Sequence, residues 1–497
     1  MKKKIVIIGA GFGGLSAAAY LARDGHEVLV LEKNNQPGGR AMIAKEKGFT
    51  FDLGPSWYMM PDVFDEFFAD FGKKTSDFYE LEKLSPSYRV YNTTTHHDVK
   101  STDEGGLALF DQIEPGSAEK IKKLLVKTEK EYNTVRKHLL EKDYTKPKDL
   151  LNPKAVQLVS NPMLLNSYHN RIKQAVKDPE LQKILEFMVV FMGGSPENIP
   201  AVYSLLSHVD LNLGIWYPMG GFGAVVKAFE KLAKKQGAKF KYNAEVTKIV
   251  TKGKRTLGVF VGEDYIPADI VIANADYHHT ETKLLDERHR AYHERYWRRK
   301  TMSPSSLLIY LGVKKQVPGL LHHTMFFDAN WHGHFNQVFK EKGWVSRPLF
   351  YVGTPSKTDP SVAPKNKENI VILVPIASGV KVDDAHRKEL VDSVIARMEA
   401  RLGVSFAKDI TVKQVRDIEY FEDTFNAYKG NAFGLAHTLT QTAVLRPRMQ
   451  SSKVQNLFYV GQYTNPGTGV PIVVLSGKVV ANLVNNTIEH EERRNHI

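Results

Sequence analysis

The chain has 497 residues, no cysteine and 68 lysine and arginine residues against 55 acidic ones, which gives a formal net charge of +13. This length predicts two or three domains. The lack of cysteine excludes disulfide bonds, thiolate catalysis and metal sites with cysteine ligands. A basic balance is typical of proteins with an anionic partner, such as nucleic acid, an acidic membrane surface or a charged substrate, but it identifies none of them.

Neither a signal peptide nor a membrane-spanning helix is predicted. Lysines at 2–4 precede an apolar stretch, but several glycines between 9 and 14 interrupt it where a signal peptide needs a helix. The most apolar later stretch, 184–192, contains Glu186 and is far shorter than the roughly 20 residues of a membrane span. We therefore expect a soluble or peripheral protein.

A strand, a glycine-rich turn and a helix open the chain, and a second strand ends in an acid, Glu32. In such a βαβ unit Gly9 permits a tight turn, Gly11 lets the backbone approach a pyrophosphate, and Gly14 lets the helix pack closely on the strand. The helix N-terminus offers free N–H groups to phosphates. Glu32 is placed to accept hydrogen bonds from ribose hydroxyls and disfavours a 2′-phosphate. The pattern predicts a bound dinucleotide rather than a purely structural turn.

The next predicted elements lead into a helix-rich region. A loop containing Gly38, Gly39 and Arg40 continues the nucleotide site. Hydrophobic periodicity then predicts a strand at 49–52 and helices at 61–71, 119–142, 163–176 and 180–192. This stretch interrupts the α/β pattern, so we expect it to form a separate substrate or cap region.

The α/β pattern resumes after this region. The predicted elements are a helix at 224–236, strands at 239–242, 245–250, 257–261, 265–267, 268–276, 307–313 and 369–376, a helix at 384–402, a strand at 456–460 and a helix at 472–488. The chain therefore builds its nucleotide-binding part from distant segments.

The segment from Gly461 to Pro471 is the second candidate site. A strand ends at Gly461, further glycines permit a close backbone approach, and Pro471 suits the first turn of a helix. The N-terminus of that helix favours negative charge, such as develops on the pyrimidine ring of a reduced flavin. An ordinary glycine loop before a terminal helix is the alternative.

Together with the N-terminal fingerprint, this segment resembles the FAD-dependent amine oxidase and phytoene desaturase superfamily, and within it the bacterial-type phytoene desaturases. The resemblance runs nearly end to end. The segments that carry it are 51–61, 214–221, 321–324, 426–434 and 465–471.

The resemblance implies an α/β fold with a Rossmann-like FAD-binding domain of the glutathione-reductase/amine-oxidase type. The discontinuous FAD-binding domain is expected to comprise 1–75, 215–290 and 445–497. A helix-rich, substrate-binding and membrane-facing region is expected at 76–214, and a mixed α+β substrate domain at 291–444.

The resemblance also assigns twelve residues to FAD. Gly9, Gly11 and Gly14 are expected at the pyrophosphate, Glu32 at the adenosine ribose and Val246 at the adenine. Gly39 and Arg40 are expected to line the middle of the cofactor. The residues expected beside the flavin are Gly461, Gly469, Val470, Pro471 and Ile472.

The implied activity is FAD-dependent desaturation of phytoene, or a close analogue, towards a lycopene-like polyene in carotenoid biosynthesis. Desaturation removes a hydride and a proton from neighbouring carbons. A hydrocarbon has no polar handle, so an apolar, aromatic tunnel is expected. Trp57, Tyr58, Trp216 and Tyr217 are candidates for its wall, although such residues are often ordinary core. No residue stands out as the acid–base catalyst.

Two further features allow more than one interpretation. His322 and His323 could face the flavin or substrate or bind a metal, but adjacent side chains in a strand diverge and no carboxylate spacing supports a metal, so we expect structural hydrogen bonds and no metal. Asp52 either lies near the flavin or accepts hydrogen bonds in the turn before Gly54.

The segment 288–300 has six basic residues against one acid and includes Tyr292, Tyr296 and Trp297. This composition fits a membrane surface, and a solvated helix face is the alternative. With no recognised nucleic-acid-binding fold, we expect no nucleic-acid partner. We expect a cytoplasmic, peripheral membrane enzyme, with the oligomeric state left open. The rival functions are a carotenoid oxygenase, a diapophytoene-type desaturase, an amine oxidase and a non-catalytic isoprenoid escort.

Overall fold

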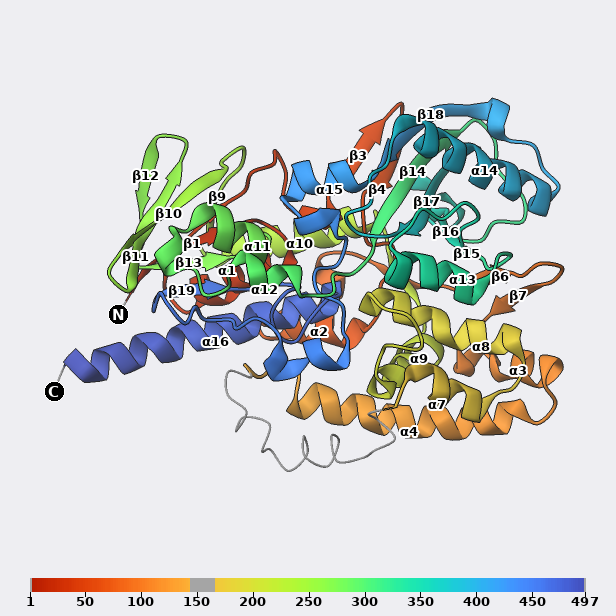
Figure 1. Cartoon of the computed structure of the whole chain (residues 1–497), viewed down its shortest axis with the longest axis horizontal. Helices are drawn as coiled ribbons and strands as arrows, with labels where there is room; N and C mark the ends of the chain where they lie inside the picture. Colours follow the sequence, from red (N-terminus) through yellow and green to blue (C-terminus); the bar gives the residue numbers. More distant parts are fainter. Residues whose placement is uncertain (1, 144–165, 496–497) are drawn as a thin grey trace.

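A five-stranded parallel sheet with strand order β19-β13-β1-β2-β9 forms the first layer of the molecule in the computed structural model, which describes residues 2–143 and 166–495 (Figure 1). Its strands come from the start, the middle and the end of the chain. They are β1 (Lys4–Ile8), β2 (Glu27–Leu31), β9 (Lys239–Lys241), β13 (Ile270–Ala273) and β19 (Leu457–Tyr459).

Alternating side chains of β1 serve the two faces of this sheet. Ile5 and Ile7 pack against the helices α1 (Phe12–Arg23), α10 (Phe222–Lys235) and α16 (Val470–Asn495). Val6 and Ile8 pack on the opposite face. The antiparallel strands on that face are β10 (Val246–Lys252), β11 (Arg255–Val261) and β12 (Asp264–Pro267). Because both faces are covered, β1 is apolar throughout after Lys4.

A seven-stranded mixed sheet with order β18-β14-β17-β16-β15-β6-β7 forms the second layer. Its strands are β6 (Tyr88–Tyr91), β7 (His96–Val99), β14 (Ser305–Val313), β15 (His323–Phe326), β16 (Phe350–Gly353), β17 (Glu368–Ile376) and β18 (Ile410–Arg416). Helix α14 (Asp384–Leu402) covers one face, while the hairpin of β3 (Ile43–Glu46) and β4 (Phe49–Asp52) packs on the other.

A helical region lies beside this sheet, below it in Figure 1. Its helices are α3 (Leu107–Ile113), α4 (Ser117–His138), α7 (Tyr168–Ala175), α8 (Pro179–Glu186) and α9 (Leu206–His208). The remaining elements are α2 (Pro61–Ala69), α11 (Tyr277–His279), α12 (Glu294–Arg298), α13 (Trp331–Asn336), α15 (Ile418–Phe425), β5 (Leu81–Lys83) and β8 (Trp216–Pro218).

The predicted helices and strands are present in the described part of the chain, with three marked differences at helix ends. The helix predicted at 472–488 extends from Val470 to Asn495. The helix predicted at 119–142 ends at His138. The helix predicted at 180–192 is α-helical only to Glu186 and continues as a 3₁₀ segment, Phe187–Met192, whose bulky and β-branched side chains favour an α-helix weakly. The first residues of the helix predicted at 163–176 lie outside the described residues.

The predicted domain boundaries stay a prediction. The parallel sheet takes strands from all three stretches that were expected to form the nucleotide-binding domain. However, β6 and β7, which lie within 76–214, pair with β15 from the stretch 291–444, so the mixed sheet spans two of the predicted regions. Among the helices of residues 2–143 and 166–495, none is both long enough and apolar enough to cross a bilayer.

Candidate active site

The turn between β1 and α1 has the geometry of a phosphate-binding loop. Gly9 has a φ of +99°, and its N–H donates to the Leu31 carbonyl at 2.7 Å. A Cβ on Gly14 would lie 2.2 Å from the Gly9 carbonyl oxygen, and a Cβ on Gly39 would lie 3.3 Å from the Gly11 Cα. The N-terminus of α1 has no side-chain cap. Its N–H groups are therefore available to an anion.

Glu32 closes the same turn from the end of β2. Its carboxylate is buried and accepts from the Ala10 N–H at 2.7 Å and from the Asn34 N–H at 2.8 Å. A carboxylate has about four acceptor positions, so hydrogen bonds from a ribose remain possible. Glu32 and Val246 border one cavity, which agrees with adjacent ribose and adenine positions.

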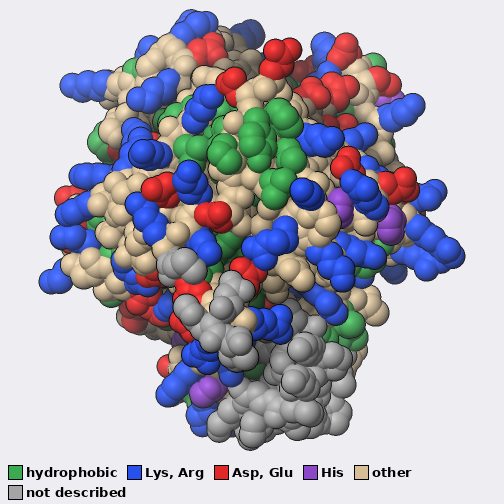
Figure 2. Space-filling model, turned by 90° about the vertical axis from the view of Figure 1, so that its left-hand side faces the viewer, with side chains coloured by type: hydrophobic (Ala, Val, Ile, Leu, Met, Phe, Trp, Pro, Cys, Tyr) green, Lys and Arg blue, Asp and Glu red, His purple; other side chains and the backbone are tan. Residues whose placement is uncertain are grey.

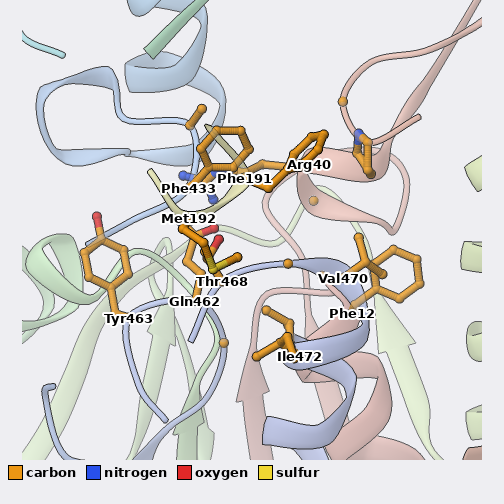
Figure 3. Close-up of a pocket in the computed structure, with 18 of the residues that line it drawn as sticks. Phe12, Arg40, Phe191, Met192, Phe433, Gln462, Tyr463, Thr468, Val470 and Ile472 are labelled. Carbon is orange, nitrogen blue, oxygen red and sulfur yellow. The ribbon is translucent and has the colours of Figure 1, made fainter. Parts of the chain in front are cut away.

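Arg40 lies in the wall of the cavity as a half-buried cation that forms no ion pair among the described residues (Figure 3). One terminal nitrogen donates to the Asn431 carbonyl at 3.3 Å, while Nε has no partner in that part of the chain. Burial lowers the pKa of the guanidinium. A partly desolvated charge without a counter-ion is costly, and an anion such as a pyrophosphate would compensate it. The glycine cradle and this guanidinium therefore fit FAD.

The second candidate segment forms the N-terminus of α16. Gly461 and Gly469 have φ values of +106° and +105°, which favour glycine. Val470 begins the helix, so Pro471 stands in its first turn, as predicted. Both, with Ile472, line the cavity.

Two polar residues after β13 connect the glycine turns, and sequence reasoning did not identify them. The Asn274 amide donates to the Gly9 carbonyl at 3.2 Å, and its Oδ1 would lie 3.1 Å from a Cβ on Gly461. The Asp276 carboxylate accepts from the Tyr463 hydroxyl at 2.6 Å. The only sequence signal was their place at the end of a buried strand, where polar residues of parallel sheets gather.

A cavity of about 770 Å³ extends from these loops between the mixed sheet and the helical region. Figure 3 shows Phe191 and Phe433 on one side of it and Val470 and Ile472 on the other. Most of the residues in its wall are aliphatic or aromatic. Such a wall suits an apolar ligand.

Of the four aromatic residues predicted to contact substrate, the structure brings only Trp57 to this cavity. Tyr58 is fully buried and stacks on Phe64, because consecutive residues of the extended segment point in opposite directions. Trp216 donates its indole N–H to the backbone beside β8, and Tyr217 is buried in the helical region. These three residues are structural, and their predicted substrate contact is corrected.

The adjacent histidines make separate hydrogen bonds. His322 Nδ1 lies 2.7 Å from the Thr358 hydroxyl, and His323 Nδ1 lies 2.7 Å from the Tyr351 hydroxyl. Both rings are buried, and burial lowers both pKa values. The expected structural hydrogen bonds are thus present.

Asp52 has neither of its two predicted roles. Its carboxylate accepts from the N–H groups of Phe222 at 2.9 Å and Gly223 at 3.1 Å, so it caps the N-terminus of α10. Burial raises its pKa to about 7. Residues 52 and 222 are too distant in sequence for this contact to have been predicted.

The aromatic side chains of 288–300 do not form a membrane-facing surface. Trp297 is fully buried and donates its indole N–H to the Tyr292 carbonyl at 3.2 Å. Tyr292 and Tyr296 pack beside it. The exposed side chains of the segment are polar or charged, Glu294 among them, so the solvated alternative describes this segment better.

The model of the family described as flavin containing amine oxidoreductase matches residues 12–485. The chain belongs to this family. It is therefore an FAD-dependent oxidoreductase. The glycine cradle independently indicates that a dinucleotide is bound.

Relatives and solved structures agree with this assignment. The chain is 40% identical to a carotenoid 3,4-desaturase of Haloarcula japonica over 96% of this chain and 97% of that protein. It is 36% identical to a zeta-carotene-forming phytoene desaturase of Myxococcus xanthus over 96% of this chain and 93% of that protein. A crystal structure of an oxidoreductase from Methanosarcina mazei matches with a TM-score of 0.65, 19% identity and coverage of 97% and 100%. At that identity the last match shows the fold alone.

Proposed function

We propose that the protein desaturates phytoene, or a closely related polyene, towards a lycopene-like product in carotenoid biosynthesis. The observation that carries this proposal is the largely apolar wall of the cavity, which continues without interruption from the residues expected to hold FAD. A hydrocarbon substrate is recognised by shape and apolar contact alone. The names of the two desaturase relatives support the same substrate class.

When bound, FAD supplies the hydride acceptor. Gly9, Gly11 and Gly14 would hold its pyrophosphate, Gly39 and Arg40 would line its middle, and Glu32 would hold its ribose. Val246 would meet the adenine. The flavin would meet Gly461, Gly469, Val470, Pro471 and Ile472.

The chain itself contributes position, exclusion of water and electrostatics. Aromatic and aliphatic side chains hold the polyene in a fixed orientation, which removes much of the entropic cost of the reaction. The N–H groups of the first turn of α16 lie at the cavity and stabilise negative charge there. Water is excluded by the same apolar wall, which suppresses side reactions.

For localisation we propose the cytoplasm and the surface of a membrane, where a polyene is dissolved. Leu439 and Leu445 support this proposal, because they are 46% and 51% exposed and also line the cavity. Figure 2 shows basic side chains spread over one face of the molecule rather than gathered in a stripe. A stripe would be typical of a nucleic-acid-binding protein.

The test is to incubate the purified FAD-loaded protein with liposomes that contain phytoene and to measure product masses. A desaturase removes hydrogen in pairs, whereas an oxygenase adds oxygen. Diapophytoene and a diamine, offered separately, test the shorter polyene and the amine oxidase activity. Reduction of the flavin by the diamine alone, or no flavin reduction by any polyene, would contradict the proposal.

A further inference from the structure

A hydrogen-bonded chain of three side chains reaches the cavity from the mixed sheet. The Tyr351 hydroxyl lies 2.7 Å from His323 Nδ1 and 2.9 Å from the Ser56 Oγ. Tyr351 and Ser56 line the cavity, while His323 lies behind them and is fully buried. A Tyr–His contact at a substrate cavity is a route for a proton.

The neighbouring strand is built to allow this contact. Gly353 pairs with His323 across β15 and β16. A Cβ on Gly353 would lie 2.6 Å from the Tyr351 hydroxyl oxygen. Because Gly353 has no side chain, the Tyr351 hydroxyl has the space that it occupies above the strand.

One ring nitrogen of His323 is left without a hydrogen bond within the part of the chain that the structure describes. Its Nε2 is buried and has no hydrogen-bond partner among the described residues. The Trp57 ring stacks on the imidazole with centroids 4.2 Å apart and planes within 10°. A buried ring nitrogen without a partner is costly, which indicates a role beyond packing.

We propose that Tyr351 and His323 together accept the proton that the polyene loses during desaturation. This inference rests on the proposed function. As the hydride leaves one carbon for FAD, the C–H bond of the neighbouring carbon breaks, and its electron pair becomes the second bond of the new C=C. The proton bonds to the Tyr351 oxygen while the hydroxyl proton of Tyr351 moves to His323 Nδ1.

The low basicity of His323 does not prevent this transfer. Burial holds the pKa of His323 well below its usual range. A C–H bond beside a carbon that is losing hydride is strongly acidic, so a weak base suffices. The resulting imidazolium would face the Trp57 ring, whose electron-rich face attracts cations.

A second tyrosine–histidine pair in the cavity provides a matched control. Tyr203 lies 2.7 Å from His437 Nδ1. However, His437 Nε2 accepts from the Thr468 N–H at 3.2 Å, so a neutral His437 carries its proton on Nδ1 and donates to Tyr203. His437 therefore cannot receive a proton from Tyr203, and the hydrogen bonds of this pair are structural.

The experiment measures flavin reduction in a single anaerobic turnover with phytoene in liposomes. We expect Tyr351→Phe and His323→Phe to slow reduction by about 100-fold or more at saturating phytoene, with unchanged flavin content and half-saturation. Gly353→Ala, which displaces the hydroxyl, should slow it to a smaller extent. Tyr203→Phe also removes one cavity hydroxyl. Its rate should stay within about threefold of the unmodified enzyme, a smaller loss than that expected when a proton acceptor is removed.

An isotope effect separates proton transfer from structural damage. With phytoene deuterated at the carbon that loses the proton, the isotope effect should be larger in Tyr351→Phe than in the unmodified enzyme. If Tyr351→Phe reduces its flavin within threefold of the unmodified rate, the proton role is wrong although the desaturase function stands. If the unmodified enzyme forms no desaturated product, the proposed function itself fails.

Discussion

At the scale of single residues, Gly14 shows how a side chain would damage the nucleotide site. Because its Cβ would lie 2.2 Å from the Gly9 carbonyl oxygen, Gly14→Ala must move α1 away from the turn. We expect the purified variant to lose most of its bound flavin, measured as the ratio of flavin to protein absorbance. Gly343→Ala, whose Cβ would meet nothing within 4 Å, is the control. Full flavin content in Gly14→Ala would contradict the assignment of this turn.

The residues that could be identified from the sequence are those whose type follows from backbone geometry. Gly9, Gly14 and Glu32 stand at fixed spacings within one βαβ unit, so a local pattern reveals them. Asn274 and Tyr351 could not be identified in this way, because each acquires its neighbours only when segments far apart in sequence fold together. Tyr58 was misassigned for the same reason, since its buried stacking partner depends on tertiary packing.

At the scale of secondary-structure elements, α10 depends on a cap from another element. Asp52 at the end of β4 accepts two N–H groups of the first turn of α10. We expect Asp52→Ala to reduce the free energy of unfolding by about 1–2 kcal/mol, since both donors would lose their partner. Asp52→Asn keeps one acceptor and should cost less. Thermal unfolding measures both variants, and equal Tm values for Asp52→Ala and the unmodified protein would exclude this role.

The segment Val209–Leu213 contains a buried acid that makes stability depend on pH. Burial raises the pKa of Asp210 to about 7, and its only described hydrogen bond comes from the Tyr88 hydroxyl at 2.8 Å. The folded state keeps this proton up to about pH 7, whereas the unfolded chain releases it near its model value of 3.8. Stability from this group is therefore greatest at low pH and falls as the pH rises through that window.

Asp210→Asn should remove this dependence. The stability of the variant relative to the unmodified protein should increase by about 1.4 kcal/mol for each pH unit between the two pKa values. Thermal unfolding at several pH values between 5 and 8 measures the difference in Tm. Asp264→Asn, at a side chain that is 77% exposed, is the control and should give a constant difference. A constant difference for Asp210→Asn as well would contradict the prediction.

At the scale of the whole molecule, the entrance to the cavity is the surface proposed to meet a membrane. Replacing Leu439 and Leu445 by serine should weaken sedimentation with vesicles by about tenfold or more, since each buried leucine contributes about 1.5–3 kcal/mol. The matched control replaces Leu257 and Tyr265, which are 42% and 45% exposed but lie away from the cavity. Equal losses in both double variants would show that exposed apolar area, rather than the cavity entrance, determines binding.

The arrangement of layers was only partly predictable. Long apolar runs such as 307–313 and 369–376 identify their strands, because these strands are buried on both faces. The pairing of β6 with β15 joins two short strands more than 200 positions apart, and neither has a distinctive pattern. Sequence reasoning therefore found the nucleotide-binding layer and its helices, but not how the mixed sheet connects the other regions.

The strands of the parallel sheet come from both ends of the chain, and α1 packs directly against α16. A ribosome releases the glycine turn first and the last helix hundreds of residues later. A nascent chain consequently has no complete pocket for its coenzyme until α16 has been synthesised. Flavin loading must then follow synthesis of α16, and a message truncated before β19 would yield a colourless protein however well its first βαβ unit folded.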